Sequence, residues 1–356
     1  MRKQGVLLVN LGTPDSPSVS DVRKYLDEFL MDERVIDIPQ LNRTLLVKGI
    51  IVPFRGPKSA KIYKELWTEN GSPLLYYGVK LKALLQEKLG SDYIVELAMR
   101  YQSPSIKTAL DSLKKQQVED IRVVPLFPQY ASASTGSVMQ KVMELVGKWQ
   151  TIPNISFVNS FHDNEGMIEV FAENARKYQP ETFDHVLFSF HGLPERQLSK
   201  ADHSGKYCLQ VENCCSRLNN INRFCYSAQS HDTARLIAEK LNLPREKYTI
   251  CFQSRLGNSP WKKPYTIQVL EKLAKEGAKR LLVFSPAFVA DCLETNIEIA
   301  VEYNEDFQKW GGEKIQLVES LNDDPKWVEA LAGIVLNMDK KPSFQAAPGE
   351  VVLHTS

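Results

Sequence analysis

The amino-acid sequence predicts an α/β protein with two similar domains, each a mainly parallel sheet with helices on both faces. Short apolar runs alternate with segments of helical periodicity along most of the 356 residues, and this alternation is typical of such sheets. The chain is also long enough to fill the cores of two domains of ordinary size. The third observation is that turn residues after strands recur in the same order in the two halves of the chain.

Three pairs of turns match between the halves. They are Gly12-Thr13-Pro14 with Gly192-Leu193-Pro194, Arg100 and Ser103-Pro104 with Arg255 and Ser259-Pro260, and Pro125 and Phe127 with Pro286 and Phe288. If the repeat is real, the loops after the matched strands line a cleft between domains at residues 1–158 and 159–322. The second domain carries a cysteine-rich insert at 202–229, and residues 323–356 form a C-terminal helix and a loosely held tail. Chance similarity among α/β units is the alternative.

The elements of the first half follow from periodicity. An apolar run at 6–10 that ends in a turn predicts a strand, and residues 20–30 show helical spacing of apolar residues behind the possible cap Ser20. The other elements expected before residue 150 are helices at 74–89, 104–116 and 138–149, strands at 93–99 and 121–125, and a polar loop at 127–137. After residue 180 we expect strands at 185–190, 248–254 and 281–285 and helices near 231–241, after 260, at 291–303 and at 325–337.

Residues 41–58 have two interpretations. Apolar residues dominate the segment, and basic residues such as Lys48, Arg55 and Lys58 interrupt it. It forms either a buried helix followed by a proline turn, or an exposed apolar lip with a basic rim. Such a lip would suit a flat apolar ligand that carries carboxylates, or a membrane surface.

Composition indicates a soluble cytoplasmic protein. The formal net charge is +1, which argues against nucleic-acid binding as the main function, because nucleic-acid-binding proteins usually show a basic excess. No window approaches 18 uninterrupted apolar residues, and the N-terminus reaches Gly12 too soon for a signal peptide. Four of the six cysteines fall within 208–225, which suggests a metal or cluster site more than a disulfide framework.

Three acids follow the strand at 281–285. If residues 291–303 are α-helical, Glu294, Glu298 and Glu302 stack along one helix face. Like charges at this spacing destabilise a helix by a few tenths of a kcal/mol per pair. The row is either a solvated helix face or a path for a cation. Its position after the carboxyl end of a strand favours a ligand site, because open α/β sheets bind ligands there.

Several motifs identify a family. They are FHGLP at 190–194, FQSR at 252–255, Trp261, PYT at 264–266 and DCLET at 291–295. With these motifs the sequence closely resembles ferrochelatases, from about residue 5 to about residue 333. The resemblance implies two Rossmann-like domains around a porphyrin cleft. It also implies a lyase that inserts ferrous iron into protoporphyrin IX to form protohaem, the terminal step of haem biosynthesis.

The reaction explains the residue types. A free-base porphyrin is nearly planar and carries two pyrrole N–H protons, so metal insertion needs a bent macrocycle, a base and a weak relay for the metal. A neutral imidazole serves as base or ligand near neutral pH. By resemblance His191 and Glu294 are the catalytic pair. The resemblance also places Glu298, Glu302 and Asp291 with them on a metal or proton route. Carboxylate and imidazole suit ferrous iron without holding it as thiolates would.

The resemblance also assigns the porphyrin site. Arg55 and Lys58 would hold the propionates, and the other contacts expected are Tyr130, Ser132, Trp261 and Phe288. Ordinary core packing is the alternative for the last two. Some family members have a tyrosine where this chain has Asp15, so a role in metal binding or porphyrin bending is not carried over to that position. The difference is a weak indication of protoporphyrin in place of coproporphyrin.

The cysteine-rich insert has the spacing C-x5-C-C-x9-C, formed by Cys208, Cys214, Cys215 and Cys225. It resembles the four-cysteine 2Fe-2S site of some microbial ferrochelatases. Four thiolates suit a 2Fe-2S cluster or a structural zinc ion, and free reduced thiols are the third possibility. Cys251 and Cys292 are separate from this group.

Other functions remain open at this point. The chain would alternatively be a chelatase for another substrate, such as coproporphyrin, cobalt or nickel, or a non-catalytic porphyrin or haem carrier. Relatives that insert cobalt or nickel usually use paired histidines, whereas this chain has one central His191. A dinucleotide-binding enzyme is disfavoured, because no G-x-G-x-x-G follows an expected strand. We expect a monomer, with a dimer as the alternative, and peripheral contact with the inner face of the membrane.

Overall fold

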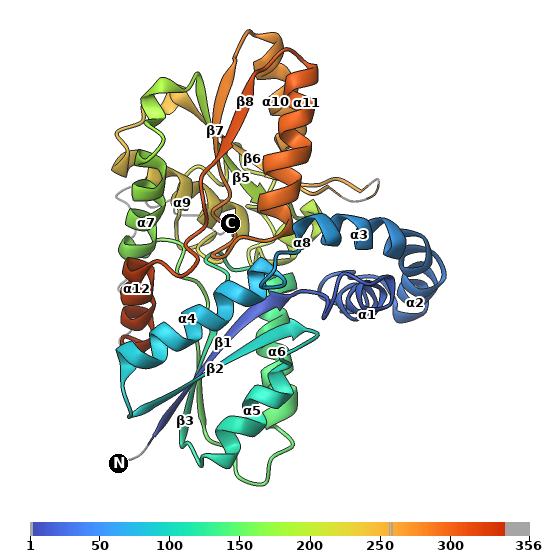
Figure 1. The fold of residues 1–356 in the computed structure, drawn as a ribbon, viewed down its shortest axis with the longest axis vertical. Helices are drawn as coiled ribbons and strands as arrows, with labels where there is room; N and C mark the ends of the chain where they lie inside the picture. The colour runs from blue at the N-terminus through green and yellow to red at the C-terminus, as the bar shows by residue number, and fades with distance from the viewer. Residues whose placement is uncertain (1–2, 256, 258, 339–356) are drawn as a thin grey trace, which may run out of the picture. The chain divides into compact units, whose positions relative to one another are not determined.

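The computed structural model describes residues 3–255, 257 and 259–338 (Figure 1). The described residues form two compact units, and neither is contiguous in the chain. The first comprises residues up to 161 together with 288–305 and 319–338, and the second comprises residues 162–287 and 306–318. The tail expected after residue 338 lies outside the described residues.

The first unit is built on a four-stranded parallel sheet in the order β2-β1-β3-β4. The strands are β1 (Gln4–Gly12), β2 (Tyr93–Tyr101), β3 (Asp120–Pro125) and β4 (Asn154–Phe157). The central strand β1 is apolar on both faces, and Val6, Leu7, Leu8 and Val9 are fully buried. A strand buried on both faces is typical of a parallel sheet covered by helices on each side.

Two pairs of helices cover this sheet. Apolar residues of α5 (Ile106–Lys115) and α6 (Ser137–Val146) pack on one face, against side chains such as Leu7 and Ile121. On the other face lies α4 (Pro73–Leu89), where Gly78 approaches Leu97, and α12 (Pro325–Leu336) packs on α4. Trp327 of α12 is fully buried and stacks on Phe161.

The other helices of the first unit are α1 (Val19–Leu30), α2 (Gln40–Leu46), the π-helix η1 (Val47–Ile51), α3 (Val52–Leu66), and the π-helices η2 (Ser132–Gly136) and η5 (Glu294–Tyr303). Of these, α3, η2 and η5 carry candidate site residues. The chain passes from η5 directly into α11 (Asn304–Lys309). The expected α-helix at 291–303 is therefore π-helical over most of its length.

The second unit repeats the topology of the first, with the strand order β6-β5-β7-β8. Its strands are β5 (His185–His191), β6 (Tyr248–Gln253), β7 (Arg280–Phe284) and β8 (Lys314–Leu317). Its helices are α7 (Glu165–Arg176), α8 (Glu195–Lys200), α9 (Tyr226–Lys240), α10 (Thr266–Lys275) and the 3₁₀ turns η3 (Pro180–Thr182) and η4 (Arg245–Lys247). Two parallel sheets flanked by helices confirm the predicted fold class.

The internal repeat is real, but one pair of turns was matched wrongly. The amide of Met99 donates to the Pro104 carbonyl (2.6 Å), and the amide of Phe252 donates to the Pro264 carbonyl (2.9 Å). Each hydrogen bond returns the loop to its strand just before α5 or α10 begins. Ser103-Pro104 therefore corresponds to Lys263-Pro264 and not to Ser259-Pro260. The loop of the second unit is longer, so Pro260, the first proline after β6, is not the counterpart of Pro104.

The domain boundaries stay a prediction, although the contacts group part of the chain differently from the sequence. Residues 288–305 and 319–338 were expected beyond the first domain, yet they belong with the first unit. The reason is that α12 packs on α4 and η5 contacts α3. Strands β4 and β8 and helix α7 were not expected, because β4 and β8 have only four residues each and lack a continuous apolar run.

Residues 40–66 form one continuous helical segment, α2-η1-α3. The prediction of a buried helix ended by a proline turn is wrong, because Pro53 lies in the first turn of α3 and Pro57 lies inside it. Four large apolar side chains of the segment are exposed: Leu41 (71%), Leu45 (62%), Ile50 (57%) and Phe54 (72%). We call these four side chains the apolar lip. In the described residues no helix is long and apolar enough to cross a membrane.

Candidate functional site

The acidic row lies along η5. Glu294 and Glu298 are half-buried and Glu302 is exposed, so exposure rises from the start of the helix toward its end. Glu298 accepts a hydrogen bond from the Tyr303 hydroxyl (2.8 Å). A π-helix uses i→i+5 hydrogen bonds and has a wider turn than an α-helix. Residues four apart therefore fall just short of one turn, and the row winds slightly around the helix.

Glu294 lies close to two buried phenols of the first unit, those of Tyr25 and Tyr63. Burial raises the pKa of the Tyr63 phenol, and the neighbouring Glu294 carboxylate raises it further. Burial also raises the pKa of Tyr25, with Tyr63 and then Glu294 adding to the effect. Burial and then Glu294 raise the pKa of the Cys292 thiol. These three groups therefore stay protonated at neutral pH. None of them supplies a counter-charge to Glu294.

Asp291 anchors the start of η5. One of its carboxylate oxygens accepts a hydrogen bond from the Ser320 amide (3.1 Å), and the other accepts one from the Asn322 side chain (2.9 Å). The Asn322 side-chain oxygen accepts from the Asp291 amide (2.9 Å). Asp291 therefore holds the 320–322 loop against the turn that delivers Glu294. This geometry favours an anchoring role, and metal binding by Asp291 stays a prediction.

His191 is the last residue of β5 in the second unit. Its carbonyl accepts a hydrogen bond from the hydroxyl of the buried Tyr226 (2.8 Å). The next residue must be glycine, since a Cβ on Gly192 would lie 2.7 Å from the Gln253 carbonyl and 3.2 Å from the Trp261 ring. This close approach fixes the backbone at Gly192, directly after His191, and the Trp261 ring lies beside Gly192.

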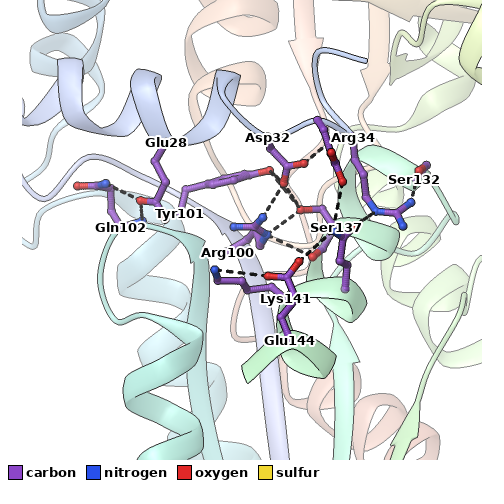
Figure 2. Close-up of polar contacts among 12 residues, drawn as sticks. Glu28, Asp32, Arg34, Arg100, Tyr101, Gln102, Ser132, Ser137, Lys141 and Glu144 are labelled. Carbon is purple, nitrogen blue, oxygen red and sulfur yellow. Dashed lines mark hydrogen bonds and ion pairs between the residues drawn. The ribbon is translucent and has the colours of Figure 1, made fainter. Parts of the chain in front are cut away.

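The polar loop expected at 127–137 contains η2. Tyr130 and Ser132 are both half-buried there, and the Ser132 hydroxyl accepts a hydrogen bond from Arg34 (2.8 Å). A buried ion pair lies nearby, in which Arg100 donates to Asp32 (2.6 Å). Figure 2 shows Asp32 and Arg100 meeting at Ser137, and Arg34 directed toward Ser132. The loop is thus held by charged partners from the segment that follows α1.

The remaining porphyrin candidates differ in exposure. Arg55 and Lys58 are exposed on α3, beside Phe54 of the apolar lip. Phe288 is half-buried and packs with Tyr77 against Leu74, Ala290 and Cys292. Asp15, at the position of the family tyrosine, is exposed. The exposed cations are accessible to carboxylates of a ligand.

The four clustered cysteines lie together in the second unit. Their sulfurs form a chain of contacts, in which Cys225 interacts with Cys208 and Cys215, and Cys215 lies 3.6 Å from Cys214. Cys208, Cys214 and Cys225 line a small pocket with Tyr207 and other side chains, and none of the four cysteines forms a disulfide. The donor set suits a four-thiolate group. Across residues 3–255, 257 and 259–338, however, no three His, Cys, Asp or Glu side chains are grouped so as to hold a metal ion.

Comparison with known proteins identifies the family. A model of ferrochelatases matches residues 3–339. The chain is 44% identical to the ferrochelatase of Legionella pneumophila (strain Lens) over 333 residues, which cover 94% of this chain and 98% of that protein. The chain belongs to the ferrochelatase family. It is also 45% identical to the ferrochelatase of Coxiella burnetii (strain Dugway 5J108-111) over 330 residues, 93% of this chain and 92% of that one.

Membership of the ferrochelatase family confirms the predicted class of enzyme, a lyase of the metal-chelatase type. Among solved structures, SirB from Bacillus subtilis with Fe3+ is 13% identical, covers 95% of this chain and 96% of its own, and has a TM-score of 0.49. That likeness is too distant to support a conclusion. The roles of individual site residues stay predictions.

The sequence did not point to Tyr25, Tyr63, Asp32 and Arg100 as neighbours of the candidate site. Tyr25 reads as an ordinary apolar position of an amphipathic helix, and Tyr63 follows an apolar segment with no motif. The sequence did carry an indication for Asp32 and Arg100, because a charged residue near the end of a helix or strand in an apolar context often has a buried partner. Only the fold shows that these charges pair with each other.

Proposed function

We propose that this chain inserts ferrous iron into protoporphyrin IX to give protohaem, the terminal step of haem biosynthesis. The observation that carries the proposal is the half-buried Glu294 of a ferrochelatase-family chain, among phenols that remain protonated. A carboxyl group at such a position can bind a cation or accept a proton. Ferrous iron and the two pyrrole protons are the species that the reaction moves.

The proposed mechanism assigns proton and metal handling to His191 and Glu294. The neutral imidazole accepts a pyrrole proton or acts as a weak ligand near neutral pH. Glu294 is the inner end of the row on η5, and Glu298 and Glu302 extend that row toward solvent. Carboxylates bind ferrous iron weakly enough to release it. The row therefore suits a path for incoming iron or departing protons.

Substrate binding is proposed to use the remaining candidates. Arg55 and Lys58 are exposed and positively charged, as propionate partners must be. Tyr130 and Ser132 supply hydroxyl groups, and Trp261 and Phe288 supply flat apolar surface. The Trp261 ring lies against Gly192, the residue directly after His191.

Further properties are proposed for other parts of the chain. The four-cysteine segment is proposed to hold a 2Fe-2S cluster, with zinc as the alternative, because three of the thiols line one pocket and Cys215 contacts two of those three. The apolar lip is proposed to give peripheral contact with the inner face of the membrane, with the protein otherwise in the cytoplasm. A monomer is the proposed state in solution.

An anaerobic assay tests the proposed function. Protoporphyrin IX and ferrous iron are mixed with the protein, and porphyrin absorbance is followed continuously. We expect iron insertion by the wild type and a loss of at least 100-fold in turnover for His191→Ala and Glu294→Ala, consistent with the usual effect of removing an acid-base group. Glu305→Ala, an exposed acid on α11, is the matched control.

The same assay separates the alternatives. Porphyrin binding without insertion of iron or zinc would identify a carrier. Faster turnover with coproporphyrin, cobalt or nickel would identify another chelatase. Full rates for both site variants would remove His191 and Glu294 from the mechanism.

A further inference from the structure

Three consecutive residues after α1 contact the η2-α6 segment. Asp32 accepts a hydrogen bond from the Ser137 hydroxyl (2.5 Å), and Glu33 accepts one from the Gln140 amide (3.3 Å). Arg34 donates to Ser132 (2.8 Å) and to Gln140 (2.5 Å). We call residues 32–34 the latch. Figure 2 shows Asp32 and Arg34 directed toward the start of α6 from the segment that follows α1.

Asp32 fixes the latch to the sheet. Its side chain is only 6% exposed, and the same oxygen that accepts from Ser137 accepts from Arg100 (2.6 Å) and from the Tyr101 hydroxyl (3.0 Å). Both of these partners lie at the end of β2. The other carboxylate oxygen accepts from the Arg34 amide (2.8 Å). A buried carboxylate with a guanidinium and several hydroxyl and amide partners has little freedom to move.

Arg34 transmits this rigidity to the loop of Tyr130 and Ser132. A Cβ added to Gly136 would lie 3.4 Å from the Arg34 guanidinium and 3.3 Å from the Tyr130 hydroxyl. The guanidinium, the phenol and the Gly136 backbone therefore pack closely at one turn. The Ser132 hydroxyl joins them through its hydrogen bond to Arg34. Both proposed porphyrin contacts of this loop are thus adjacent to one arginine.

We propose that Arg34 is a positioning residue for porphyrin binding, which holds the Ser132 hydroxyl in the orientation that the porphyrin requires. The inference rests on the proposed function, since it takes the 127–137 loop as part of the porphyrin site. Arg34 acts through Ser132 and makes no contact with the substrate itself. Its guanidinium is held by hydrogen bonds to Ser132 and Gln140, so the loop keeps one conformation before the substrate arrives.

The test is a double-mutant cycle on porphyrin affinity. Protoporphyrin IX binding is measured by fluorescence titration without metal, on wild type, Arg34→Met, Ser132→Ala and the double variant. A hydrogen bond to a charged group contributes about 1.5 kcal/mol or more, so we expect each single variant to weaken binding about tenfold. The double variant should bind no more weakly than Ser132→Ala alone, because Arg34 then has no hydroxyl to hold.

Two further variants complete the design. Arg34→Lys keeps a donor and the charge and should recover part of the lost affinity. Arg176→Met is the matched control, since the Arg176 guanidinium also donates to two partners, the Glu169 side chain and the Lys240 carbonyl, but lies on α7 of the second unit. In turnover assays Arg34→Met should raise the KM for porphyrin, while kcat and the KM for iron change by less than twofold.

Several results would overturn the inference. Additive losses in the double variant would mean that Arg34 contacts the porphyrin directly. A parallel fall in kcat, both KM values and the unfolding temperature would mean a purely structural role. Unchanged affinity in Arg34→Met, beside a wild type that binds and metallates porphyrin, would refute the inference alone. A wild type that binds porphyrin but inserts no metal would instead refute the proposed function.

Discussion

At the scale of single residues, Glu294 and Glu302 share one helix but have different surroundings. Glu294 is half-buried among protonated phenols, whereas Glu302 is exposed. A charge that lies close to the reacting atoms in a low-dielectric environment acts strongly, and an exposed charge is screened by salt. The inner acid should therefore affect the chemical step and the outer acid the arrival of iron.

This difference gives the first prediction. Glu294→Gln should lower kcat by at least 100-fold. Glu302→Gln should raise the KM for ferrous iron by less than tenfold and leave kcat unchanged, and added salt should shrink its effect. Anaerobic kinetics at varied iron and salt concentrations measure both, with Glu305→Gln as control. Equal losses of kcat in Glu294→Gln and Glu302→Gln would contradict a graded path.

The second prediction concerns His231 on α9, which stacks on Phe252 and has an Nε2 atom that is buried without a hydrogen-bond partner. Burial lowers the pKa of His231 from 6.5 to about 4, with Lys262 and Arg245 adding to the effect. Below its unfolded pKa the unfolded chain binds a proton that the folded protein excludes. The stabilising contribution is therefore full above pH 6.5 and is lost as the pH falls toward about 4.

His231→Leu should remove this pH dependence. The free energy of unfolding of the wild type should fall on acidification from pH 6.5 to 4.5, by up to about 3 kcal/mol from this residue. The variant should fall by less over the same range in urea titrations. His203→Leu, which replaces an exposed histidine, should behave as wild type. A variant with the same acid sensitivity as wild type would assign the effect to other groups.

At the scale of elements, the cysteine segment before α9 gives a prediction about metal content. Purified anaerobic protein should absorb visible light and contain iron and sulfide at two atoms of each per chain, as a 2Fe-2S cluster requires. Cys215→Ser should lose the colour, because one of four ligands is gone. Cys251→Ser should keep it, since Cys251 lies in β6 outside the group.

Metal analysis of the same sample decides between the alternatives for this segment. Colourless protein with one zinc per chain would support a structural zinc site. Colourless protein with neither zinc nor iron and sulfide would leave four free thiols and refute both metal proposals.

The apolar lip on α2-η1-α3 gives the fourth prediction. Leu45 and Phe54 are largely exposed, and Lys48, Arg55 and Lys58 are exposed nearby. Burial of a large apolar side chain contributes about 1.5–3 kcal/mol. The protein should co-sediment with anionic vesicles, less so at high salt, and the double variant Leu45→Ser, Phe54→Ser should bind at least tenfold more weakly. Met143→Ser on α6 is the matched control. Equal binding by all three proteins would exclude the lip from membrane contact.

Some elements could be predicted from the sequence and others could not. The central strands β1 and β5 are continuous apolar runs because both their faces are covered, so their position is readable. The edge strands β4 and β8 are short and only partly apolar, and nothing in four residues distinguishes them from loop. Acids spaced by four are compatible with an α- or a π-helix, so the type of η5 was not predictable. The exposure of the apolar lip was also undetermined, because an apolar segment suits a core as well as a surface.

The candidate site likewise has residues that could be predicted from the sequence and residues that could not. His191 ends β5 and Glu294 follows β7, and both lie in recognisable motifs, so sequence alone singled them out. The phenols around Glu294 come from α1 and α3, more than two hundred positions earlier in the chain, and the latch partners come from three separate elements. Proximity of this kind depends on tertiary packing, which a single sequence does not encode in any local pattern.

At the scale of the whole molecule, the first unit is completed by residues from the far end of the chain. The α12 helix packs on α4, Trp327 stacks on Phe161, and the buried Arg122 donates to the Val335 carbonyl (2.6 Å). Lys88 also pairs with Glu329 at the surface. The N-terminal sheet is thus covered on one face by a helix more than 160 positions later in the chain than β4, so it lacks part of its core until residues 325–336 have been synthesised.

The fifth prediction follows from this topology. Trp327→Ala leaves a large cavity and should lower the free energy of unfolding of the first unit by about 3–5 kcal/mol. Leu336→Ala, which truncates an exposed side chain on the same helix, should change it by less than about 0.5 kcal/mol. Hydrogen exchange locates the effect: amides of β1 and β3 should lose protection in Trp327→Ala, while those of β5 and β7 should keep it. Loss of protection in β5 and β7 alone would show that α12 stabilises the second unit instead.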